Sequence, residues 1–144
     1  MNPTLSLSTR AGAAGCLAAS GAVHAELYLH GYRTIPGVGP AFLLQASGAF
    51  AVTFLLLVTS AAVPRLAAAA LALGSLGGFA ASRTVGIFGF VERGLQPAPQ
   101  ALISILTEVA VLGLLASSWS CQWTLRRGFR FAPLDQGQKE EPCQ

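Results

Sequence analysis

Polar and ionisable side chains interrupt the long apolar stretches of this 144-residue chain, and their types could support chemistry. An ionisable side chain within a membrane-spanning helix costs about 2.5–3.5 kcal/mol on insertion scales, so it normally faces the bundle interior and has a partner. The set comprises His24, Glu26, His30, Gln45, Ser82, Arg83, Ser104 and Glu108. We expect these side chains to form a ligand- or proton-binding cluster, or else a polar clamp that fixes the register of the helices.

Arg83 decides the expected chemistry of this cluster. Because a guanidinium does not readily lose its proton, Arg83 needs an anion if it is buried among helices. Glu108 is the preferred partner, since a short loop joins the two predicted helices, and Glu26 is expected nearby. With both carboxylates ionised the cluster would carry one excess negative charge, so a proton, a cation or a histidine would have to balance it.

The two histidines limit which metal or haem sites the chain could form. Glu26 and His30 are four residues apart and share a helix face, whereas His24 is rotated away from both. Both histidines lie on one helix, so they cannot clamp a haem from facing helices. A metal site of Glu26, His30 and a third group is the weaker alternative to a His30 that extends into the membrane interface. The sequence therefore predicts neither a metal nor a cofactor.

No residue pattern typical of an enzyme is present. The sequence offers no nucleophile paired with a base, no glycine-rich phosphate loop and no CxxC motif. Cys16, Cys121 and Cys143 are too widely spaced to predict a disulfide framework or a zinc site. An enzyme or a redox component is accordingly the third of our hypotheses.

The composition indicates an integral membrane protein. The chain is 53% hydrophobic and 10% charged, whereas a soluble domain is about a quarter charged. Four segments have the roughly 20 apolar residues needed to cross a bilayer, at about 11–29, 41–62, 66–88 and 100–122. We predict an all-α fold, an integral membrane four-helix bundle over residues 1–124. A disordered cytoplasmic tail over residues 125–144 would follow it.

Positive charge indicates the orientation of the bundle. Arg10, Arg65 and the arginines after the fourth segment fall on one side, whereas the other side holds Arg33 in one external loop and Glu92 with Arg93 in the other. The positive-inside rule then places both termini in the cytoplasm. On this assignment all the polar residues of the cluster map to the outer half of the bilayer. The basic residues behind the net charge of +3 are explained as topology signals, so this charge does not indicate nucleic-acid binding.

The first segment has an alternative interpretation as a cleaved signal peptide. It consists mostly of Ala and Gly, and Val23, His24 and Ala25 before Glu26 resemble a signal-peptidase site. Cleavage there would leave three spans.

Small residues recur at four-residue intervals on two of the predicted helices. Association in lipid depends on close van der Waals approach, which small residues allow. We therefore predict that the first and third spans lie at the centre of the bundle, in close contact. The packing face of the third span would consist of Ala70, Gly74, Gly78, Ser82 and Gly86, and that of the first of Gly12, Cys16 and Ser20.

The sequence contains the short words Tyr28-Leu29-His30-Gly31-Tyr32, Ile35-Pro36, Gly39 before Phe42-Leu43-Leu44, Ser82-Arg83-Thr84-Val85-Gly86 and Phe88-Gly89-Phe90. These words resemble a group of uncharacterised small four-span integral membrane proteins of actinobacteria. The general plan is also loosely similar to DoxX-like proteins. The resemblance covers about residues 20 to 115 and implies a bacterial plasma-membrane protein with a four-helix bundle, but it implies no activity.

Two hypotheses for the function stand ahead of an enzyme. The first is an accessory or structural inner-membrane protein whose polar cluster binds a small ligand or a proton. The second is a proton- or cation-coupled transporter or sensor subunit that uses Glu26, Arg83 and Glu108. The expected partners are the lipid bilayer and either further copies of the chain or a larger membrane complex, with no nucleic acid.

Overall fold

Four long helices make up the part of the chain that the structure, a computed structural model, describes: the backbone of residues 6–131 and the side chains of residues 6–117. The helices are α1 (Leu7–His30), α2 (Val38–Val58), α3 (Ala62–Thr84) and α4 (Gln100–Phe131), with a short 3-10 helix, η1 (Tyr32–Thr34), between α1 and α2. The all-helical prediction is confirmed.

Three of the helices in this described part are long and apolar enough to cross a membrane: α2, α3 and the Gln100–Ser117 portion of α4. Helix α1 is longer than α2 and α3 but falls outside this group, because Arg10, His24 and Glu26 interrupt a segment rich in Ala, Gly and Ser. Composition alone therefore supports a membrane protein with three apolar helices.

The ends of the helices follow local sequence signals. Ser6 caps α1, with its hydroxyl accepting a hydrogen bond of 3.2 Å from the Thr9 amide. Gly37 precedes α2 with a φ of +76°, a conformation that glycine adopts without steric cost. Pro40 and Pro64 both lie in the first turn of a helix. Backbone N–H groups there have no acceptor within the helix, so the N–H that proline lacks costs no hydrogen bond.

Helix α4 continues past the predicted boundary of the bundle. The tail was predicted to begin at residue 125, but the backbone is helical to Phe131. The remainder of the predicted tail lies outside the described residues.

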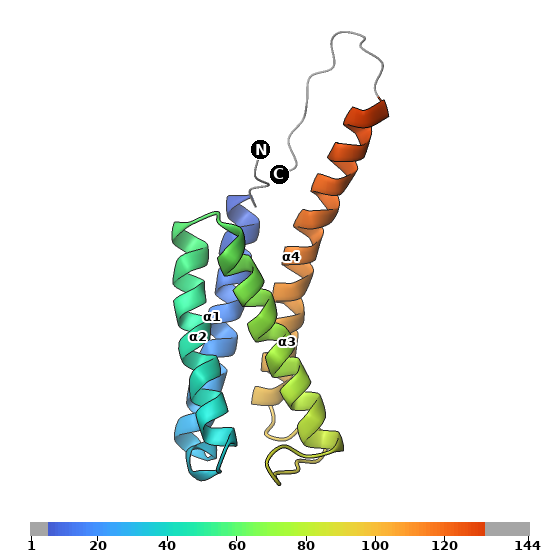
Figure 1. Cartoon of the computed structure of the whole chain (residues 1–144). Coiled ribbons are helices and arrows are strands. Elements are labelled where there is room, and N and C mark those ends of the chain that lie inside the picture. The colour runs from blue at the N-terminus through green and yellow to red at the C-terminus, as the bar shows by residue number, and fades with distance from the viewer. Residues whose placement is uncertain (1–5, 132–144) are drawn as a thin grey trace.

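Helix α1 occupies the centre of the bundle, where it packs along α2 and α4 (Figure 1). Helix α3 has fewer contacts, with α2 and α4, and it leans away from α2 toward its own C-terminal end. The predicted close contact between the first and third spans is therefore wrong. The small residues of α1 face α2 and α4, since a side chain at Gly21 would meet Ala49 on α2 and one at Gly12 would meet Leu114 on α4.

The buried core consists of small and medium apolar side chains from all four helices. It comprises Ala13, Ala14, Leu17, Ala49, Val52, Leu56, Ala68, Ala72, Val111 and Leu115. Many larger side chains point outward, including Leu44 and Phe54, which are 71% and 63% exposed. This distribution suits a molecule whose surroundings are as apolar as its interior.

Candidate functional site

The polar residues of interest form two clusters at one end of the bundle. This is the end at which α1 and α3 finish and α2 and α4 begin. The first cluster lies inside the bundle around Glu108, and the second joins Arg83 to the connection between α3 and α4.

Glu108 is the centre of the buried cluster and is 1% exposed. Its Oε1 accepts hydrogen bonds of 2.9 Å from the hydroxyls of Ser20 on α1 and Ser104 on α4. Within the described part of the chain, Oε2 accepts no hydrogen bond and no cationic side chain contacts the carboxyl group. The carboxyl group is thus held in place on one oxygen only.

His24 belongs to the same cluster through Ser20 and is 7% exposed. Its Nδ1 lies 2.9 Å from the Ser20 carbonyl oxygen, which can only accept, so Nδ1 carries the hydrogen. In a neutral ring Nε2 then accepts from the Ser75 hydroxyl on α3, 3.1 Å away. Ser20 therefore bonds to His24 through its backbone and to Glu108 through its side chain.

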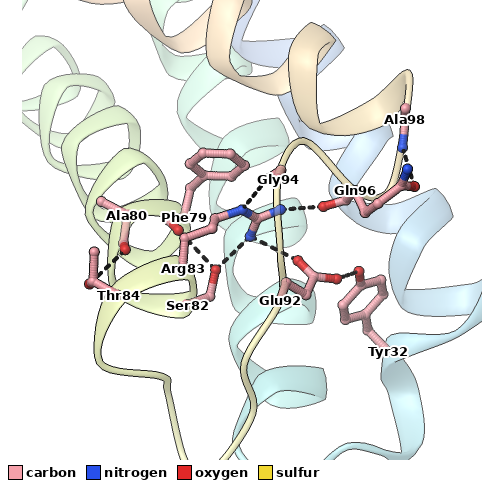
Figure 2. Close-up of polar contacts among 10 residues, drawn as sticks. All are labelled: Tyr32, Phe79, Ala80, Ser82, Arg83, Thr84, Glu92, Gly94, Gln96 and Ala98. Atoms are coloured by element: carbon pink, nitrogen blue, oxygen red, sulfur yellow. Dashed lines mark hydrogen bonds and ion pairs between the residues drawn. The ribbon is translucent and has the colours of Figure 1, made fainter.

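Arg83 belongs to the second cluster, in which every nitrogen of its guanidinium has an acceptor (Figure 2). Its Nη1 forms an ion pair of 2.8 Å with Glu92 and donates to the Ser82 hydroxyl. Nε donates to the Gly94 carbonyl at 3.0 Å, and Nη2 donates to that of Gln96. The guanidinium carbon also lies 3.8 Å from the centre of the Phe79 ring.

The predicted pairing of Arg83 with Glu108 is therefore not formed in the structure, and Glu26 is not its partner either. Arg83 lies one residue before the end of α3, so its side chain reaches the connection and not the middle of α4. The connection folds back on α3, where the Glu92 amide donates to the Ser82 carbonyl at 3.0 Å. Sequence reasoning placed Glu92 in an external loop and missed it, although a carboxylate shortly after a helix that ends in arginine was the available signal.

Tyr32 extends the second cluster across to η1. Its hydroxyl donates to Oε1 of Glu92, and its ring stacks on Phe42 with the centroids 4.7 Å apart. Burial, and then the hydrogen bond to Glu92, raise the pKa of the Tyr32 hydroxyl above its ordinary value. The hydroxyl therefore remains a donor, and it ties the α3–α4 connection to the α1–α2 connection.

Glu26 and His30 stand apart from both clusters and are exposed. His30 bonds through Nδ1 to the backbone oxygen of Glu26, not to its carboxylate. That carboxylate instead accepts a hydrogen bond of 3.3 Å from Gln100. Residues 6–117 bring together no group of three His, Cys, Asp or Glu side chains able to hold a metal ion.

A cavity of about 620 Å³ connects the two clusters. All four helices contribute to its wall, which is mostly apolar, and Gln45 on α2 adds an amide that donates to the Leu71 carbonyl at 3.3 Å. His24 and Glu108 lie in the wall, and so do Arg83 and Glu92. The cavity is of a size that holds a small organic molecule.

The small residues of α3 line this cavity where a packing face was expected. A side chain at Gly74 would meet no atom within 4 Å, and one at Gly78 would only touch Ile87. Ser82 bonds to Phe79 and Arg83. Gly86 lies beyond the end of α3, where its φ of +78° allows the chain to turn. In the part of the chain whose side chains are described, none of these four residues brings α3 against another helix.

No protein-family model, no curated protein and no solved structure matches the chain. The resemblance to small actinobacterial membrane proteins stays a prediction.

Proposed function

We propose that this chain is a four-span protein of the bacterial inner membrane, of accessory type, that binds a small and largely apolar molecule in the cavity between its helices. Glu108 is the polar anchor for that molecule. The observation that carries the proposal is a buried carboxyl group, held through one oxygen, in the wall of an apolar cavity of about 620 Å³.

The position of α1 supports a fourth span. At its start, Arg10 donates to the carbonyls of Leu56 and Leu57 at the end of α2, at 3.0 and 2.8 Å. At its end, η1 leads directly into the start of α2. A helix of 24 residues is about 36 Å long, enough to cross the hydrocarbon core together with α2 and α4.

The contacts of α1 also support its retention in the mature protein. Signal-peptide cleavage before Glu26 would remove Leu17 from the core. It would also remove Ser20 and His24 from the neighbourhood of Glu108.

The arginines support an orientation with both termini in the cytoplasm. Arg10 and Arg65 lie at the end of the bundle where α1 begins, and the sequence places Arg126, Arg127 and Arg130 at the end of α4 on the same side. The cavity then lies toward the outer leaflet.

A photolabelling experiment tests the proposed binding cavity. The probe is a small alkyl alcohol that carries a diazirine, and mass spectrometry of the labelled protein in detergent locates the modified residues. We expect label on Glu108 although its side chain is 1% exposed, and label on the exposed Glu26 as well.

Two glycine variants provide the matched comparison. Gly78→Phe projects a ring from the cavity wall and should reduce the labelling of Glu108 at least severalfold without changing that of Glu26. Gly113→Phe adds the same ring to an exposed part of α4 outside the cavity and should change neither. An unlabelled Glu108, or labelling that Gly78→Phe leaves unchanged, would contradict the proposal.

The alternative, a proton- or cation-coupled transporter or sensor subunit, draws support from one observation. His24 bonds to the backbone carbonyl of Ser20 and Glu108 accepts from its hydroxyl, so one residue links two titratable side chains in the cavity wall. In this alternative the coupling groups are His24 and Glu108, because Arg83 is already paired with Glu92 and Glu26 lies at the surface.

A further inference from the structure

The charges around the cavity do not balance when Glu108 is ionised. The titratable groups in its wall are His24 from α1, Tyr32 from η1, Arg83 from α3, Glu92 from the connection and Glu108 from α4. Helix α2 contributes Gln45 but no charge. The Arg83 and Glu92 charges cancel in their ion pair, so an ionised Glu108 beside a neutral His24 leaves one uncompensated negative charge in an apolar space.

Such a carboxylate is strongly disfavoured unless a positive charge accompanies it. Oε1 is held by the hydroxyls of Ser20 and Ser104, whereas no described residue donates to Oε2. A proton on Glu108 would remove this charge. A cation in the cavity would provide the same compensation.

Arg83 does not make the cavity a site for anions. Glu92, Ser82 and two loop carbonyls already accept from its guanidinium. A bound carboxylate or phosphate would have to displace Glu92 and would then face two acids. The electrostatics of the cavity favour positive charge.

Aromatic rings and the shape of the opening agree with a positively charged apolar ligand. The Tyr32 ring contacts both Phe42 and Phe90 in the cavity wall, and the Phe42 ring also lies 5.1 Å from the His24 ring, between centroids. The faces of aromatic rings attract organic cations. On the side between α2 and α3, exposed residues such as Leu44 and Gly74 belong to the wall, so the cavity is open to the surroundings of the helices.

We propose that the cavity binds a hydrophobic organic cation, an amine or a quaternary ammonium, in exchange for the proton on Glu108. This inference rests on the proposed function, because it names the class of molecule that the cavity binds. The exchange is balanced: the O–H bond of the Glu108 carboxylic acid breaks, the proton passes to bulk water, and the carboxylate that remains pairs with the cation without any covalent bond to it. The net charge of the cavity is the same before and after.

Two probes of the same shape separate charge from apolar fit. Benzyltrimethylammonium is a cation, and neopentylbenzene is its uncharged carbon analogue. Equilibrium dialysis of the detergent-solubilised protein against detergent alone measures their binding, and an indicator dye in weak buffer measures proton release. We expect the cation to bind with release of about one proton. Its apparent affinity should rise about tenfold per pH unit as long as the empty site is protonated.

Carboxyl variants assign the proton. Glu108→Gln should abolish both cation binding and proton release and should leave the binding of neopentylbenzene unchanged. Glu26→Gln, which removes an exposed carboxylate outside the cavity, should change none of these. Proton release that survives Glu108→Gln but is lost in His24→Gln would assign the proton to His24 and overturn the proposal.

The two proposals fail in different ways. If neopentylbenzene binds, and Gly78→Phe prevents it, while benzyltrimethylammonium does not bind at any pH, the cavity is a binding site but the inference of a cation is wrong. If neither probe binds and the diazirine probe leaves Glu108 unlabelled, the proposed function itself is wrong.

Discussion

At the scale of single residues, the sequence predicted that Glu108 would both pair with Arg83 and belong to the binding cluster. In the structure these two roles belong to different acids, Glu92 and Glu108. Glu92 compensates Arg83 near the surface of the bundle, with both side chains about one-sixth exposed. Glu108 is buried without a cation and bonds to two hydroxyls. One residue therefore stabilises the fold of a connection, while the other is available to a ligand.

A double-mutant cycle measures this division of roles. Arg83→Met and Glu92→Gln should each lower the free energy of unfolding, and because the two residues are in contact, their combination should differ from the sum by about 1 kcal/mol. The measurement is unfolding in mixed micelles with increasing denaturing detergent.

The matched cycle pairs Arg83→Met with Glu108→Gln. These side chains share no hydrogen bond or ion pair in the described residues, so the effects should add to within about 0.5 kcal/mol. A larger interaction energy in this second cycle than in the first would instead support the Arg83–Glu108 pairing that the sequence predicted.

At the scale of the elements, α1 holds the bundle together because its small residues let two neighbours approach closely. An added Cβ at Gly21 would lie 3.0 Å from the Cβ of Ala49 and 3.5 Å from the Ala46 carbonyl oxygen. Arg10 satisfies the last carbonyls of α2, where a positive charge also interacts favourably with the helix dipole. Helix α3 has no comparable contact at Gly74, and the cavity lies along its small residues.

The close approach at Gly21 predicts a difference between two glycines of the same helix. Gly21→Val should destabilise the protein by about 1–3 kcal/mol, because α1 and α2 must separate to admit the side chain. Gly15→Val should have a small effect, since a side chain there meets no atom within 4 Å. Unfolding of the two variants in the same mixed micelles measures the difference, and equal losses would show that α1 does not depend on this contact.

At the scale of the whole molecule, the contacts of α1 bear on the topology. Helices α2, α3 and α4 have the length and composition to cross a membrane, and α1 lies along two of them. A helix enclosed by spans on two sides can be less apolar than its neighbours, because less of its surface meets lipid. This explains how α1 can carry His24 and Ser20 in its buried face.

The expected topology is tested by fusions and by the N-terminus of the purified protein. A fluorescent protein that folds only in the cytoplasm should fluoresce when fused to either end of the chain. A phosphatase that folds only outside the inner membrane should be active when inserted at Gly89, in the connection between α3 and α4. N-terminal sequencing that begins at Glu26, or a C-terminal fusion that stays dark, would contradict four spans with both termini inside.

The sequence by itself determined which segments of this protein are helical, because length and hydropathy are local properties. The bounds differ, since α1, α2 and α3 each begin three or four residues earlier than predicted and α4 ends later. It also predicted correctly that His24, Arg83 and Glu108 lie toward the same end of the bundle, since alternate helices must run in opposite directions. Only the tertiary structure decided which residues meet. The partner of Arg83 depends on how the connection after α3 turns back through Gly86 and Gly94, and the small residues of α3 line a cavity because α3 leans away from α2. Spacing along the chain specifies which residues share a helix face. The packing of all four helices together determines which helix, if any, lies against that face.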